Sequence, residues 1–143
     1  MQPNPLQTGL LVFEENLELI QQALEKNVIR MANSRFAPQN PLRPNREVVY
    51  DETGKFVMPH SRLGISLAAS FKQIDTIFKP KTTKWLILVD RNSMMPDGLK
   101  LSQDNPDHWS VVVTKKLTIA EFEERIDKLI QTWRALGRFV RYD

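Results

Sequence analysis

Two adjacent segments decide the fold: His108-Trp109-Ser110-Val111-Val112-Val113-Thr114 and, after two lysines, Leu117-Thr118-Ile119-Ala120-Glu121-Phe122. The first is short and rich in β-branched and aromatic residues, which predicts a strand. In the second, Thr118 and Glu121 have the spacing of a capping box, and apolar residues then recur at helical period. We therefore predict a helix that runs from Thr118 to its end at Gly137. A strand followed by an amphipathic helix is typical of an α/β or α+β domain.

The rest of the sequence predicts a small set of further elements. They are a helix over 10–26, a strand over 28–32, a long loop over 33–47, a hairpin formed by 48–50 and 55–58, a helix that begins at Ser66 and ends at Pro80, a buried strand over 85–89, and a short strand over 99–101. The predicted fold class is α+β, with a small mixed, mostly antiparallel β-sheet and about three helices. We expect a single domain over 1–143, in which residues 1–9 form a loose N-terminal arm.

The composition narrows the classes of function. The 143 residues are 41% hydrophobic and 26% charged, as in ordinary globular proteins, and carry a net charge of +3. The absence of cysteine excludes disulfides and thiolate chemistry. With only two histidines, at no metal-binding spacing, we predict no metal site. No segment reads as a signal peptide or a membrane span, so we expect a cytoplasmic protein that does not insert into membranes.

His108 is the first candidate for chemistry. It begins the predicted strand after the turn at 104–107 and shares one strand face with Ser110. A histidine at a sheet end can donate, accept or change charge near neutral pH. The alternative is that His108 only caps a turn carboxylate, Asp104 or Asp107.

Ser66 is the second candidate, because Gly64-Ile65-Ser66 leads into a predicted helix. Amides at a helix start can face a phosphate or a carboxamide, although a serine there is also an ordinary N-cap. Arg30 and Arg43 could hold a diphosphate bidentately, and Lys100 lies beside the turn that precedes His108. For each of these basic side chains the alternative is a solvated surface role. Trp109 could stack on a flat ring or pack in the core.

Three motifs in order resemble a known family. They are Gly64-Ile65-Ser66-Leu67, then Met95-Pro96-Asp97-Gly98-Leu99-Lys100-Leu101, then Asp107-His108-Trp109-Ser110 with the helix that follows. Over roughly residues 42–130 the chain resembles the small type VI secretion toxins that have an ADP-ribosyltransferase-like fold. The resemblance implies a toxin that binds NAD in a cleft between sheet halves, acts inside a target cell, and is restrained by an immunity or antitoxin protein. It also implies delivery by a secretion system without a cleaved signal.

Site residues follow from the same resemblance. Ser66 and His108 match catalytic positions, and the NAD-binding set is Arg30, Arg43, Gly64, Ser66, Lys100 and Trp109. Classical members of the wider fold place a glutamate on a late strand to stabilise the positive charge that develops at the nicotinamide ribose. The sequence contains no clear Glu-x-Glu or Gln-x-Glu, so it leaves transferase activity and the acceptor open.

Two alternatives remain at this stage. The first is a non-enzymatic interaction or nucleic-acid-binding domain that uses the arginine-rich loop 35–46. The second is phosphotransfer on RNA by the same fold.

Overall fold

A computed structural model describes residues 9–143. The elements are β1 (Leu10–Val12), the 3₁₀ turn η1 (Phe13–Glu15), α2 (Leu17–Ala23), β2 (Asn27–Ala32), β3 (Phe56–Val57), β4 (Gly64–Ala68), α3 (Phe71–Ile77), β5 (Thr82–Asp90), β6 (Leu99–Asn105), β7 (His108–Val113), β8 (Leu117–Thr118), α4 (Ile119–Ile130) and β9 (Arg134–Arg141). Over this range the chain is α+β, with three α-helices and a mixed, mostly antiparallel sheet, as predicted. The expected arm at 1–9 lies almost wholly outside the described residues.

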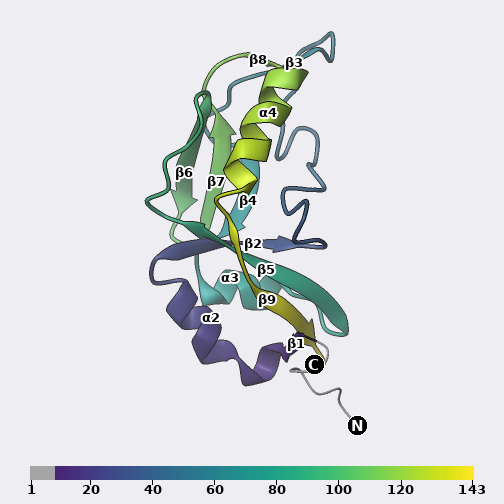
Figure 1. Cartoon of the computed structure of the whole chain (residues 1–143), viewed down its shortest axis with the longest axis vertical. Coiled ribbons are helices and arrows are strands. Elements are labelled where there is room, and N and C mark those ends of the chain that lie inside the picture. Colours follow the sequence, from purple (N-terminus) through teal and green to yellow (C-terminus); the bar gives the residue numbers. More distant parts are fainter. Residues whose placement is uncertain (1–8) are drawn as a thin grey trace.

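The main sheet has the strand order β1-β9-β5-β2-β4-β7-β6, and β3 pairs with β8 in a small second sheet. The β1–β9 pair is parallel, and the other neighbours are antiparallel. In Figure 1 the strand β2 runs across the molecule, whereas β4, β7 and β6 follow its long axis. The main sheet therefore consists of two halves, β1-β9-β5-β2 and β4-β7-β6.

Little backbone pairing joins the two halves of the sheet. The strands β2 and β4 share one backbone register pair, Ile29 with Ala68, whereas β4 and β7 are paired over five residues. Beyond Ile29 the two strands diverge, and side chains must satisfy the backbone groups that the ladder leaves open.

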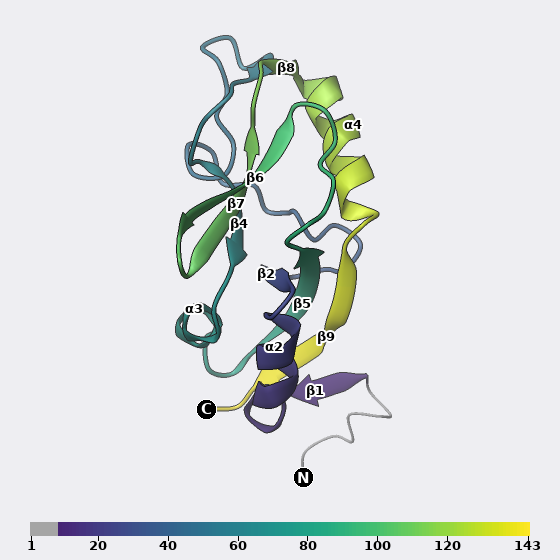
Figure 2. The ribbon, with the colours of Figure 1, turned by 90° about the vertical axis from the view of Figure 1, so that its left-hand side faces the viewer.

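Each face of the sheet has its own hydrophobic core. One contains Phe122, Ile126 and Leu129 of α4, and the other contains Ile20 of α2 and Ile74 of α3. Figure 2 shows α3 and α4 on opposite sides of the sheet. The strand β5 contributes to both cores, because alternate side chains of a strand point to opposite faces. The predicted strand over 85–89 is thus confirmed as covered on both faces.

The helix α4 begins as predicted and ends earlier. The Thr118 hydroxyl accepts from the backbone N–H of Glu121, and the Glu121 carboxylate accepts from the backbone N–H of Thr118, which completes the capping box. The helix ends at Ile130, and Arg134–Arg141 forms β9. The prediction that the helix continues to Gly137 is wrong, because pairing of this segment with β5 and β1, both distant in sequence, overrides its local period.

The same pairing changes the N-terminal prediction. The expected helix over 10–26 is wrong in its first third: Leu10–Val12 forms β1 beside β9, and α2 covers Leu17–Ala23. The predicted strand at 28–32 is confirmed as β2.

The third predicted helix also starts later than expected. Gly64–Ala68 is the strand β4, so Ser66 lies in a strand and does not cap a helix. The true cap of α3 is Ser70, whose hydroxyl accepts from the backbone N–H of Gln73. Two features of the sequence favour a strand at Ser66 and a later helix start. Ser70 is a second capping serine four residues after Ser66, and Ile65 and Leu67 alternate into the core as residues of a strand do.

The loop over 33–47 is confirmed as irregular apart from an isolated bridge that begins at Pro44. The predicted hairpin at 48–58 is present in part. Tyr50 bridges Val57, and Gly54 adopts a positive φ of 72° at the turn, but the partner strand of β3 is β8. The strand expected at 99–101 extends to Asn105, so Asp104 lies on a strand and not in the turn.

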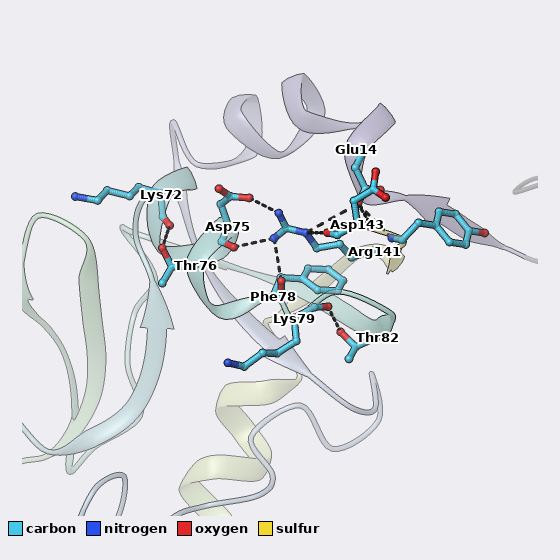
Figure 3. A network of polar contacts seen from close by, with 10 residues as sticks. Glu14, Lys72, Asp75, Thr76, Phe78, Lys79, Thr82, Arg141 and Asp143 are labelled. Atoms are coloured by element: carbon cyan, nitrogen blue, oxygen red, sulfur yellow. Dashed lines mark hydrogen bonds and ion pairs between the residues drawn. The ribbon is translucent and has the colours of Figure 1, made fainter.

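The C-terminal end of β9 is fastened to α3 by one arginine (Figure 3). The Arg141 guanidinium donates to the Asp75 carboxylate and backbone carbonyl, both at 2.7 Å, and to the Phe78 carbonyl at 2.9 Å. It also lies 4.7 Å from the centroid of the Phe13 ring. The contacts join β9, α3 and η1, which are far apart in the sequence.

Candidate functional site

A cavity of about 450 Å³ opens where β2 and β4 diverge. Its polar lining is Arg30, Arg43, Glu47, Ser66, Gln73 and His108. We call this cavity the split-sheet pocket. Four of the seven residues that the sequence singled out, namely Arg30, Arg43, Ser66 and His108, therefore meet at one place.

The strand register explains why Ser66 and His108 come together. Ser66 lies opposite Ser110, and Ala68 lies opposite His108. Residues two apart on one strand share a face, so Ser66 and His108 are diagonal neighbours on the same face of the β4–β7 pair. Diagonal neighbours of this kind are about 7–8 Å apart, within reach of one ligand.

Arg30 supports the pocket rather than offering free donors to it. Its Nε donates to the Pro38 carbonyl, and one terminal nitrogen donates to the carbonyls of Gln39 and Pro41. The other terminal nitrogen donates to the Glu47 carboxylate at 2.5 Å and to the Ser66 carbonyl at 3.0 Å. All five N–H groups of the guanidinium thus have protein acceptors, and a ligand would find none unoccupied.

Glu47 completes this arrangement. Its carboxylate accepts from Arg30, from the Nε of Arg43 at 2.9 Å and from the backbone N–H of Ser66 at 3.0 Å. Burial raises the pKa of Glu47, but the Ser66 N–H and the two guanidinium groups lower it further, so the pKa lies below its ordinary value of 4.5. Together Arg30 and Glu47 satisfy the backbone N–H and C=O of Ser66, which β2 leaves open.

Arg43 lines the pocket and keeps hydrogen-bond donors that a ligand could use. It uses its Nε for Glu47, its side chain is 51% exposed, and within residues 9–143 its two terminal nitrogens have no other partner. A guanidinium held at Nε presents its terminal nitrogens as a fork suited to an anionic oxygen pair.

His108 pairs with a carboxylate. Its Nδ1 lies 2.8 Å from Oδ2 of Asp104, and both side chains are about a quarter exposed. The alternative that His108 caps Asp104 thus names the right partner, although Asp104 lies on β6 and not in the turn. The contact also fixes the ring, and within the described part of the chain Nε2 has no partner.

Three predicted NAD-binding residues lie elsewhere. Gly64 is buried in the strand pair, where an added Cβ would stand 2.0 Å from the Val111 carbonyl oxygen, so close strand packing explains the glycine at this position. Trp109 packs against the core on the opposite face, with the Arg91 guanidinium 5.4 Å from its ring centroid. Lys100 lines a different cavity, near His60 and Ser102.

Sequence reasoning missed Glu47 and Gln73, and it named Asp104 only as one of two turn carboxylates that His108 caps. A glutamate at the end of an arginine-rich loop and directly before Val48 is a local signal of a buried ion pair, and it could have drawn attention to Glu47. Gln73 carries no comparable signal, because only the packing of α3 brings it to the pocket.

No protein-family model, curated protein or solved structure matches this chain. Across residues 9–143, no three His, Asp or Glu side chains gather into a group that could hold a metal ion. None of the helices in that range combines the length and the apolar character that a bilayer crossing requires.

Proposed function

We propose that the chain is an NAD-binding toxin domain of ADP-ribosyltransferase type, which acts in the cytoplasm of a target cell and is neutralised by an immunity or antitoxin protein. One observation carries the proposal: Ser66 and His108, from two motifs of the resemblance 42 residues apart in the sequence, line the same pocket between two sheet halves. A cleft between sheet halves is where the resemblance expects the dinucleotide.

Different side chains of the pocket suit different parts of NAD. The free terminal nitrogens of Arg43 suit a diphosphate oxygen pair, and the Ser66 hydroxyl suits a carboxamide or ribose hydroxyl. His108, oriented by Asp104, can take up or release a proton through Nε2. Arg30 and Glu47 hold the pocket open and are not assigned contacts with the dinucleotide.

Transfer of ADP-ribose requires stabilisation of a developing positive charge at the ribose. The carboxylate that lines the pocket is Glu47, and two arginines neutralise it. NAD binding is therefore the core of the proposal, and transfer is the reaction that the resemblance implies.

The test has two parts. Purified protein is melted with and without NAD; at 100 times the dissociation constant, NAD would stabilise the fold by about 2.7 kcal/mol. Ser66→Ala and His108→Ala are then expected to lose both the NAD-induced shift and toxicity on expression in a sensitive host. Lys26→Met, on the exposed surface after α2, is the control. Folded variants that kill as well as the parent would refute the assignment of the site.

A second candidate function rests on the loop 35–46. Phe36 is 79% exposed, and the Arg35 guanidinium lies 4.8 Å from the centroid of its ring, an arrangement on which a base of single-stranded RNA could stack. This function predicts salt-dependent RNA binding that Phe36→Ala abolishes, with no thermal shift by NAD.

A further inference from the structure

A second cavity, of about 390 Å³, lies on the same sheet half as the split-sheet pocket. Its polar lining consists of His60, Ser61, Lys100, Ser102 and Thr114. Every one of these side chains can donate a hydrogen bond, and no aspartate or glutamate is among the residues that line the cavity. We call it the Lys100 pocket.

His60 presents a donor because its tautomer is fixed. Its Nδ1 accepts from the backbone N–H of Arg62 at 3.0 Å and from that of Leu63 at 2.9 Å. A nitrogen that accepts two hydrogen bonds carries no proton, so in the neutral ring the proton is on Nε2. The backbone N–H of His60 donates to the Val113 carbonyl, which anchors this segment to β7.

Lys100 supplies the charge. Its side chain is exposed, and within residues 9–143 its ammonium group makes no ion pair or hydrogen bond. We propose that the Lys100 pocket binds a phosphate-type anion, with Lys100 as the charged ligand and the hydroxyl groups of Ser61, Ser102 and Thr114 around it. A cavity with an unpaired ammonium, neutral donors and no competing carboxylate is suited to this class of ligand.

The two pockets open on one face of the β4-β7-β6 half. Lys100 lies opposite Val112, and Ser102 lies opposite Ser110, which in turn lies opposite Ser66. Val112, Ser110 and His108 alternate onto the same face, so a row of three serines separates the Lys100 end from the His108 end. The four residue-to-residue steps from His108 to Val112 span about 13 Å along the strand. The anion could belong to a molecule that reaches both pockets or to a separate one.

The test is a titration of inorganic phosphate into ¹⁵N-labelled protein at pH 7.5 and constant ionic strength, followed by amide chemical shifts. We expect saturable shifts at residues 60–62, 100–102 and 112–114. Lys100→Met should weaken binding about tenfold or more, because charge-assisted hydrogen bonds are roughly twice as strong as neutral ones. Ser102→Ala should weaken it less. Lys26→Met removes the same charge from an exposed residue that lines neither pocket and should leave binding unchanged.

A titration with NAD in place of phosphate identifies the source of the anion. If NAD shifts both pockets in one binding event and Lys100→Met weakens that event, the phosphate belongs to the dinucleotide. If phosphate shifts the Lys100 pocket and NAD does not, the pocket serves a different phosphate-bearing molecule. Either result supports an anion site, and the second stands even if the proposed NAD function fails.

Two results would overturn the inference. One is the absence of saturable shifts at these three segments in the folded parent. The other is binding that persists unchanged in Lys100→Met, or that disappears equally in Lys26→Met, since it would then reflect general surface charge.

Discussion

The two long edges of β4 are satisfied in different ways. Toward β7 the strand has a continuous ladder of five residue pairs, and toward β2 it has one pair followed by the side chains of Arg30 and Glu47. The ladder makes a closed, rigid boundary, whereas the ion pair keeps two diverging strands apart and leaves a cavity beside them. A pocket can thus be built inside a sheet when buried side chains replace a backbone ladder.

The largest effect is expected from Glu47→Ala, which removes the carboxylate that takes the place of backbone pairing at the β2 edge of β4. The change leaves the Arg30 guanidinium buried without its counter-charge and the Ser66 N–H without an acceptor. Breaking a buried pair in this way costs about 3–5 kcal/mol, which urea unfolding would measure. Glu47→Gln retains an acceptor oxygen and should cost less. A loss below about 1 kcal/mol for Glu47→Ala would mean that the ion pair does not hold the boundary.

Gly64→Ala tests the opposite edge. The new Cβ would meet the Val111 backbone, which can move only if β4 and β7 separate, so we expect a loss of about 1–3 kcal/mol in the free energy of unfolding. Gly137→Ala is a matched control, because there the Cβ would meet the end of the Leu11 side chain at 2.8 Å, and that side chain can rotate away. Equal losses at the two glycines would contradict a rigid β4–β7 boundary.

Thr118→Ala is a reference variant, because Thr118 caps α4 and lies away from both edges of β4. It removes the hydroxyl half of the capping box of α4 and should cost about 1 kcal/mol, measured by thermal or urea unfolding. NAD or phosphate binding should be unaffected, because Thr118 lines neither pocket. A change in binding here would show that the pockets depend on α4.

The smallest effect expected at the β2 edge is a difference in how stability depends on pH. The pKa of Glu47 is lower in the folded protein than its ordinary value of 4.5, so the carboxylate stabilises the fold fully above that pH. This contribution is lost as the pH falls from about 4.5 through the folded pKa. Urea midpoints measured from pH 7 to pH 3 should therefore fall less steeply in Glu47→Gln than in the parent. Parallel profiles would exclude Glu47 as a source of the acid sensitivity.

Local pattern predicted much of this fold correctly. Three features could be predicted because the sequence patterns behind them each lie within a few residues. They are the strand that begins at His108, the capping box at Thr118 and the strand over 28–32. The errors at 10–12 and 134–141 share one cause, since each segment becomes a strand by pairing with the other. The site was predictable in part: the pattern drew attention to Ser66 and His108, but it read Ser66 as a helix cap.

The sequence by itself determined the α+β class, the order of most elements and the identity of the side chains available for chemistry. Periodicity, capping residues and turns are short-range properties of a chain. Only the tertiary structure decided that Arg30 is committed to five acceptors, that Glu47 supports Ser66, and that Lys100 belongs to a second pocket. These outcomes depend on the point where β2 and β4 diverge, which is set by packing between residues far apart in the chain.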